Sequence, residues 1–376
     1  MDRQKKLVYV PMAVDTIHPG HLNIIRIASE LGEVMVGLFT DEAIASYKRV
    51  PVMNYEQRKA VIESIKGVDI VVKQETRDYE PNLRKYKPDY MVHGTDWREG
   101  PLSAVRERAI EVMAEWGGSI VEPEYTKGVS SSALHAQEGK NGVTPVQKML
   151  NLKRMLETKK NSRIMGAFNG QTALAVEEFE TNANDGVKRR FDAIWVDREG
   201  IALEKGIKKQ EFLDRSQCFE CVREICIHSN KPIIMEYFGE DVEQFLRNAE
   251  QAGVSAIAIN AADIEEKKKL LSDFWNLRKH QEMMILVMAD LKEENKIENY
   301  AKAGADGIIV NSCSSNIAQE FSDSRQDALP VLLILDERMD NEGQQREDEL
   351  SGIIYKNYIS SKQENILKEL LTEVLK

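Results

Sequence analysis

A regular alternation of short apolar runs with amphipathic runs constrains the fold of this chain more than any other feature. In the first third, the apolar runs predict strands at residues 7–10, 33–39, 68–72, 89–93 and 119–122. Between them, amphipathic runs predict helices at residues 22–31, 54–65, 79–86 and 102–116. Because the connections are short, the alternation predicts an α/β fold with a parallel sheet covered by helices on both faces.

The rest of the chain repeats this alternation more regularly. Strands are expected at residues 163–168, 191–196, 232–235, 256–260, 284–288, 307–310, 331–335 and 352–355. Eight strands in roughly 210 residues fit a compact (β/α)8 barrel, whose functional residues lie at the C-terminal ends of the strands. The segments to consider there include Asp197–Glu199, Glu236–Gly239 and Asn260–Ala262.

The length of 376 residues is sufficient for two domains, each with its own core. Loop-like residues 137–144 mark a boundary, because they are rich in glycine and polar residues. We therefore divide the chain into a first domain at 1–138, a linker with a connecting helix at 139–162, and a barrel at 163–376.

Charge and composition exclude several classes of protein. The formal net charge of −11 argues against a general nucleic-acid binder. No apolar run approaches the ~18 residues of a membrane span, and the N-terminus lacks a signal-peptide core. We expect a cytoplasmic protein. Cys218 and Cys221 form a Cys-x-x-Cys pair, a pattern that also occurs in redox and zinc sites. They lie in an expected helix, and the sequence has no second pair at zinc spacing. We therefore interpret them as packed side chains.

Two histidines lie where the first strand turns into a helix. Asp15-Thr16-Ile17-His18-Pro19-Gly20-His21 separates the apolar run at 7–10 from the helical run at 22–31. Ligands collect at this end of the strands in open α/β sheets, and a helix N-terminus offers N–H groups that suit phosphate. Gly20 allows close backbone approach, and the imidazoles add hydrogen-bond donors. On spacing alone, two surface histidines are an equally good interpretation.

Further motifs give the first domain a resemblance to the cytidylyltransferase family. Besides the His-x-Gly-His turn, these are Lys48, Arg58, the turn Gly94–Trp97 and Gly128–Ser131, which is similar to the family's Gly-Ile-Ser-Thr helix start. The resemblance covers most of residues 5–137. It implies a Rossmann-like nucleotidyltransferase domain that joins CMP from CTP to a phosphorylated small molecule and releases pyrophosphate.

The resemblance also implies site residues. The expected catalytic residues are His18, His21, Lys48 and Arg58. The two histidines would bind the α- and β-phosphates, and Lys48 and Arg58 would bind the acceptor and the triphosphate. The expected nucleotide-binding residues are Asp15, Gly20, Gly94, Asp96, Trp97, Gly128, Ser130 and Ser131. Mg²⁺ is expected to accompany the triphosphate, largely hydrated. The alternatives are that the two cations are solvated, that Trp97 is a core or lid residue, and that the serines only cap a helix.

Two departures from the family pattern concern the acceptor. Met12-Ala13-Val14-Asp15 stands where the family often has Gly-Thr-Phe-Asp, and Tyr125-Thr126-Lys127-Gly128 where it often has Arg-Thr-Glu-Gly. These changes make glycerol phosphate a less favoured acceptor than a small phosphonate.

The barrel resembles the phosphoenolpyruvate mutase and isocitrate lyase barrels. The resemblance rests on Phe191–Trp195, Lys231–Ile234, Ala303–Asp306 and Tyr355–Asn357. The same two-domain order occurs in fused proteins of phosphonate biosynthesis. It implies an acceptor similar to 2-hydroxyethylphosphonate, and a homo-oligomer that pairs through the last helix, at 364–375.

The barrel departs from that family at positions needed for chemistry. Glu236-Tyr237-Phe238 stands where active mutases carry an Asp-x-Asp-like pair, Asn260-Ala261-Ala262 replaces a Glu-Asp-Lys stretch, and Lys209 falls at a catalytic Asp. Because Mg²⁺ prefers carboxylate oxygens, we interpret the barrel as catalytically silent. Two alternatives stay open: a bifunctional enzyme whose barrel uses Glu236, Asp197 and Asp290, and a non-catalytic nucleotide-sensing scaffold.

Overall fold

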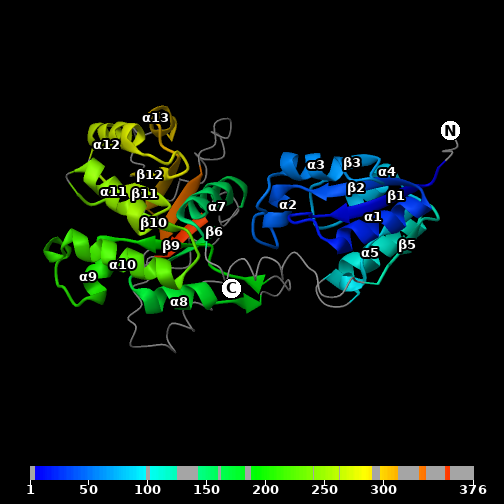
Figure 1. Cartoon of the computed structure of the whole chain (residues 1–376), viewed down its shortest axis with the longest axis horizontal. Helices are drawn as coiled ribbons and strands as arrows, with labels where there is room; N and C mark the ends of the chain where they lie inside the picture. The colour runs from blue at the N-terminus through cyan, green and yellow to red at the C-terminus, as the bar shows by residue number, and fades with distance from the viewer. Residues whose placement is uncertain are drawn as a thin grey trace. The chain divides into compact units, whose positions relative to one another are not determined.

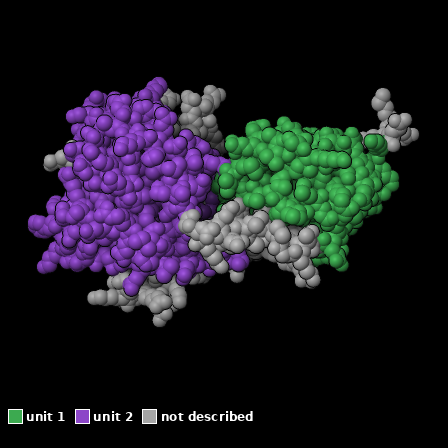
Figure 2. All heavy atoms as spheres, in the orientation of Figure 1, with its two compact units in different colours: residues 1–141, 184–187 green, residues 142–183, 188–376 purple. Residues whose placement is uncertain are grey.

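The computed structural model describes residues 5–98, 102–124, 143–159, 162–182, 188–239, 241–261, 263–289, 297–311, 330–335 and 352–355. The chain forms two compact units, coloured separately in Figure 2. The first comprises residues 1–141 and 184–187, and the second comprises residues 142–183 and 188–376.

The first unit is built on a parallel sheet (Figure 1). Its described strands are β1 (Leu7–Met12), β2 (Glu33–Phe39), β3 (Ile70–Gln74), β4 (Tyr90–Val92) and β5 (Ser119–Val121). They lie in the order β3-β2-β1-β4-β5, so the sheet grows first on one side of β1 and then on the other. This order creates a switch point between the C-terminal ends of β1 and β4, where ligands bind in folds of this class.

Helices cover both faces of this sheet, as the alternation predicted. The helices are α1 (Pro19–Leu31), α2 (Asp41–Ala45), α3 (Tyr55–Glu63), α4 (Glu80–Tyr86) and α5 (Ser103–Ala114), with a 3-10 turn, η1 (Thr95–Trp97). Val8 and Val10 of β1 share a hydrophobic cluster with Ile25 of α1 and Ile62 of α3. Leu7 and Tyr9 point to the other face, where Leu83 of α4 and Val112 of α5 pack. The period of two along β1 thus sorts its side chains between two cores.

Helix α1 begins earlier than the sequence pattern predicted. The expected helix at 22–31 starts at Pro19, and His18 takes the N-cap position. Proline is favoured at the first helical position, since its φ angle suits a helix and its missing N–H would be unpaired there. His21 consequently lies within the first turn of the helix, one turn above His18.

The second unit is a closed barrel of eight described strands (Figure 1), and each of them overlaps a strand predicted from the sequence. The strands are β6 (Ser162–Gly166), β9 (Ala193–Val196), β10 (Ile233–Glu236), β11 (Ala256–Ile259), β12 (Met284–Ala289), β13 (Gly307–Asn311), β14 (Val331–Leu335) and β15 (Gly352–Tyr355). Neighbouring strands are parallel, and β15 pairs with β6 to close the barrel. An antiparallel pair outside it, β7 (Thr181–Asn182) and β8 (Lys188–Arg189), was not predicted.

The helices of the second unit supply the outer layer of its core. They are α7 (Pro145–Thr158), α8 (Gly170–Glu178), α9 (Arg198–Glu204), α10 (Arg215–His228), α11 (Val242–Ala252), α12 (Ile264–Leu277) and α13 (Ile297–Lys302), with a 3-10 turn, η3 (Gln210–Phe212). Cys218 and Cys221 are buried in α10, as expected for packed thiols. Burial raises the pKa of the Cys218 thiol to about 12 and therefore disfavours the thiolate needed for metal or redox chemistry.

Within the part of the chain that the structure describes, no helix is both long and apolar enough to cross a membrane.

Candidate functional site

The two sequence-predicted histidines lie at the switch point of the first sheet. His18 caps α1 directly beyond the end of β1, and β4 runs beside β1. The α1 N-terminus therefore points its unpaired N–H groups and the positive end of its dipole into this crevice. This is the expected place for a phosphate group.

The two imidazoles form a stacked pair. Their ring centroids are 3.8 Å apart and the rings are tilted by 32°. The backbone holds this spacing, because the His21 N–H donates to the His18 carbonyl at 2.9 Å. His18 exposes only 9% of its surface. Neither Nδ1 atom has a hydrogen-bond partner among the described residues, although both atoms are buried. Buried polar atoms are nearly always paired, so this pair is suited to a ligand.

Burial also fixes the charge of the pair. Desolvation lowers the pKa of His18, and it lowers the pKa of His21 to about 4, with smaller contributions from His18 and Lys48. Both imidazoles are therefore neutral at neutral pH, and each presents one N–H donor. The influence of Lys48 on His21 also shows that this lysine lies close to the histidine pair.

This low pKa predicts a pH dependence of stability. An unfolded histidine titrates near 6.5, whereas His21 in the fold titrates at about 4. Between these values the unfolded state binds more protons, so the free energy of unfolding falls as the pH falls through this window. From pH 7 to pH 5 we expect His21 to account for at most about 2 kcal/mol. Thermal unfolding of wild type and His21→Gln at both pH values checks this, because the wild type should lose more stability. Equal losses would contradict it.

A buried arginine holds the turn that leads to the histidines. The Arg58 side chain is fully buried. Its guanidinium donates to the carbonyls of Ala13 at 2.6 Å and Met53 at 3.2 Å, and pairs with Asp41 at 2.5 Å. The sequence predicted Arg58 as a contact to phosphate or acceptor. The structure gives its guanidinium three protein partners, which anchor the turn, and the contact to phosphate or acceptor stays a prediction.

Val14, next to Ala13, shows why the turn needs such an anchor. Its φ of 51° lies in the left-handed region, which is unfavourable for a β-branched residue. Such a conformation costs about 1–3 kcal/mol and persists only when surrounding contacts impose it. Here Arg58 holds the preceding carbonyl, and the Val14 side chain is itself buried. The strained residue redirects the chain from β1 toward Asp15 and His18.

The carboxylate of Asp15 organises the neighbouring loop. One oxygen accepts from the Val52 N–H at 2.6 Å, and the other pairs with Arg49 at 3.1 Å. Asp15 thus ties the loop after α2 to the turn after β1. The ammonium of the exposed Lys48 lies 5.6 Å from the ring centroid of Tyr47. The structure therefore brings Asp15, Lys48 and the two histidines into one region.

On the β4 side of the switch point, Trp97 belongs to the core. Its indole is fully buried, stacks on His93 with centroids 4.0 Å apart, and donates from Nε1 to Glu122 at 2.7 Å. The Trp97 ring is therefore packed in the core, which was one of the two interpretations of the sequence, and its role beside the nucleotide stays a prediction. Gly94 is buried at the start of η1, and Gly20 lies in the first turn of α1.

Comparison with known proteins agrees with this geometry. Residues 14–137 match a family model described as cytidylyltransferase-like. The glycerol-3-phosphate cytidylyltransferase of Staphylococcus aureus is 30% identical over 122 residues, which are 32% of this chain and 85% of that protein. The chain belongs to the cytidylyltransferase-like family.

The family model matches residues of the first unit only. The bifunctional protein HldE of Gluconobacter oxydans is 30% identical over 132 residues, or 34% of this chain, and the match spans about a quarter (26%) of that protein. Among solved structures, the match to the phosphoenolpyruvate phosphomutase of Streptomyces platensis subsp. rosaceus covers 59% of this chain and 83% of that chain, at 18% identity and a TM-score of 0.47.

Several expected residues of the cytidylyltransferase-like domain lie outside the described part of the chain. These are Gly128, Ser130 and Ser131, together with the side chain of Asp96. Their assignment stays a prediction.

Sequence reasoning missed two residues beside this site, Tyr47 and Arg77. Tyr47 immediately precedes Lys48, and Arg77 follows the end of β3 by three residues. Their position after strands at the ligand-binding edge of the sheet was the signal that could have identified them.

The described residues of the cytidylyltransferase-like domain fit a metal carried by its ligand rather than by a protein cage. No group of three or more His, Cys, Asp or Glu side chains among the described residues could hold a metal ion. The carboxylate of Asp15, three residues before His18, is engaged with Arg49 and Val52. Mg²⁺ keeps several waters and is commonly held by substrate phosphates, so this arrangement is compatible with it.

At the C-terminal ends of the barrel strands, Asp197 and Glu236 accept hydrogen bonds from protein groups. Asp197, after β9, accepts from the Trp195 indole at 2.8 Å and from the Gly200 N–H at 2.7 Å. Glu236, at the end of β10, accepts from the Asn260 amide at 2.8 Å. Two of the three carboxylates considered for an active barrel thus have protein partners, while Asp290 lies outside the described residues.

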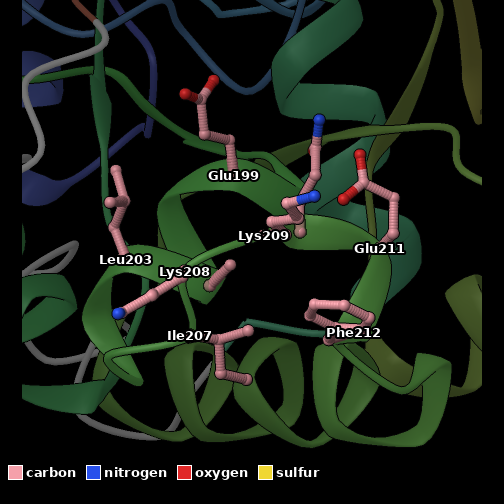
Figure 3. Close-up of a pocket in the computed structure, with 9 residues that line it drawn as sticks. Glu199, Leu203, Ile207, Lys208, Lys209, Glu211 and Phe212 are labelled. Atoms are coloured by element: carbon pink, nitrogen blue, oxygen red, sulfur yellow. The ribbon is translucent and has the colours of Figure 1, made fainter.

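A pocket of about 600 Å³ lies beside α9 and η3 in the second unit (Figure 3). Lys208, Lys209, Glu199 and Glu211 line it together with Leu203, Ile207 and Phe212. The lining combines charges of both signs with exposed apolar side chains, so it points to no single ligand class.

Proposed function

We propose that this protein transfers CMP from CTP to a small phosphonate or phosphate monoester, with release of pyrophosphate. The observation that carries the proposal is the neutral His18–His21 pair at the N-terminus of α1, whose buried Nδ1 atoms have no hydrogen-bond partner among the described residues. Membership of the cytidylyltransferase-like family supports the same reaction class. The chain spans only part of HldE, so activity and substrates are proposed from the site.

In the proposed reaction, an anionic oxygen of the acceptor attacks the α-phosphorus of CTP. The new P–O bond replaces the bond to the β-phosphate, and pyrophosphate leaves with the electron pair. Because the nucleophile is already anionic, no general base is required. Catalysis then depends on positioning and on donors that meet the developing charge.

The residues take distinct roles in this scheme. His18 and His21 donate hydrogen bonds to the α- and β-phosphates, and the α1 N-terminus adds backbone N–H groups. Lys48 neutralises charge beside His21. Asp15 and Arg58 hold the loops in place. Mg²⁺, if it accompanies the triphosphate, would supply further charge neutralisation.

A phosphonate is the acceptor that we favour, and 2-hydroxyethylphosphonate is the first candidate. The departures at Met12–Asp15 and Tyr125–Gly128 and the fusion to a mutase-like barrel support this choice. We further propose that the barrel is catalytically silent, since Asp197 and Glu236 are engaged in protein hydrogen bonds.

The test is pyrophosphate release by the full chain with CTP, ATP, GTP and UTP against a panel of phosphonates and phosphate monoesters. We expect release with CTP and one small phosphonate. Release only with a phosphate monoester would reject the phosphonate assignment. CTP binding without release for any acceptor would reject the enzyme and favour a nucleotide sensor. Turnover of phosphonopyruvate would show that the barrel is active.

A further inference from the structure

Arg77 lies on the same edge of the sheet as the histidine pair, but the reaction described above does not use it. It follows β3, which pairs with β2 and places Gln74 opposite Phe39 at the C-terminal end of both strands. The Arg77 Nε atom is buried and has no hydrogen-bond partner among the residues that the structure describes. A buried guanidinium nitrogen without an acceptor is costly, unless a ligand supplies the acceptor.

The turn that carries Arg77 is fixed in place. The buried amide of Gln74 donates to the carbonyls of Thr76 at 2.7 Å and Asp78 at 2.9 Å. The Gln74 carbonyl oxygen is held in turn by Tyr9 and by Asn82. These bonds connect the turn to the centre of the sheet, so the position of Arg77 is set before any ligand binds.

The guanidinium of Arg77 lies over the ring of Tyr47. Its central carbon lies 4.9 Å from the centroid of the Tyr47 ring. Stacking of this kind uses the face of the guanidinium and leaves its N–H edge available for a planar, two-pronged contact. Tyr47 is half-buried and packs edge-on against Phe39, with centroids 6.1 Å apart, which fixes the surface under the guanidinium.

The charges around this surface favour an anion. Lys48 neighbours the same ring and acts on His21, so cations extend from the histidine pair to Arg77. The nearby carboxylates of Asp41 and Asp15 are paired with Arg58 and Arg49. Of the nucleotide-binding residues expected from the sequence, Asp15 and Gly20 follow β1 and the others follow β4 and β5, which leaves the flank of β2 and β3 for the acceptor.

We propose that Arg77, stacked on Tyr47, binds the phosphonate or phosphate group of the acceptor and is a specificity-determining residue of this site. The inference rests on the proposed function. The Arg77 N–H edge contacts the oxygens that do not attack, while the attacking oxygen faces the α-phosphorus beside His21. Guanidinium is well matched to such a tetrahedral anion.

The experiment measures initial rates of pyrophosphate release while acceptor and CTP are varied separately, with wild type, Arg77→Gln and Arg77→Lys. We expect Arg77→Gln to raise the KM for the acceptor by about 10–100-fold, the size of a lost charge-assisted contact, with little change in the KM for CTP. Arg77→Lys should restore part of the loss, because it keeps the charge but not the two-pronged geometry. Arg26→Gln, which removes an exposed arginine paired with Glu30 on α1, is the matched control and should behave as wild type.

The outcomes separate the two proposals. An unchanged acceptor KM in Arg77→Gln overturns the inference and leaves the reaction intact. A raised KM for CTP alone also overturns it, since Arg77 would then bind the triphosphate. Failure of the wild type to release pyrophosphate with any acceptor rejects the proposed function itself. If Arg77→Gln does not fold, Arg77→Lys takes its place. A raised acceptor KM in Arg77→Lys then supports the inference, and an unchanged acceptor KM overturns it.

Discussion

Replacing His21 with alanine is expected to lower the rate of pyrophosphate release by about 10²–10³-fold, the usual cost of one donor to developing charge. The imidazole is neutral and stacked on His18, so the variant removes a donor without leaving a buried charge. Steady-state rates at saturating CTP and acceptor measure the effect on kcat. The KM for CTP should change less, because the donor matters most when charge builds on the bridging oxygen.

The fold should survive this change, since the His21 ring has no hydrogen-bond partner to lose at Nδ1 in the described structure. His280→Ala is the matched control, because that histidine belongs to the second unit. Full activity of both His21→Ala and the corresponding His18→Ala would contradict the assignment of the site.

Replacing Arg58 with methionine is expected to destabilise the first unit by about 3–5 kcal/mol, because it removes one partner of a buried ion pair. The variant also leaves the carbonyls of Ala13 and Met53 without their donor. Hydrogen exchange of the β1 and β2 amides, followed by mass spectrometry, reports on this unit separately from the barrel. Activity should fall together with protection, because the turn at Val14 loses its anchor.

Arg84→Met provides the contrast for Arg58. Arg84 makes ion pairs with Glu80 and Glu115, but its side chain is 43% exposed, so its loss should change protection far less. If Arg58→Met instead keeps wild-type protection and raises the KM for CTP, then the direct phosphate contact predicted from the sequence is correct.

The sequence was most informative about helices and strands that a short run of neighbouring residues is enough to predict. The strands of both units were found from short apolar runs, and the helix expected at 54–65 is present as α3, which Asn54 caps by accepting from the Gln57 N–H. The start of α1 was misplaced, because His18 and Pro19 carry no apolar signal. The antiparallel pair β7–β8 was missed, since two-residue strands show no periodicity.

The site was predicted less completely, for physical reasons that particular residues illustrate. His18 and His21 were located because a strand, a turn and a helix follow one another there. Arg58 has the same charge as Lys48, but sequence position does not reveal that one is buried under three protein acceptors and the other exposed. The burial of Trp97 could not be foreseen for a similar reason, because it depends on a hydrogen bond to Glu122, 25 residues along the chain. Arg77 was missed since its environment comes from β2, β3 and the loop after α2.

The left-handed backbone at Val14 has a consequence for the order in which the first unit folds. Local preference opposes this turn, so it forms only after Arg58 arrives from a position 45 residues along the chain from Ala13. Contacts of such separation are formed late, because the intervening chain must first lose its entropy. We therefore expect the histidine pair to reach its spacing only after α3, which carries Arg58, has packed against β1 and β2, and mild denaturant to abolish activity before it opens these two strands.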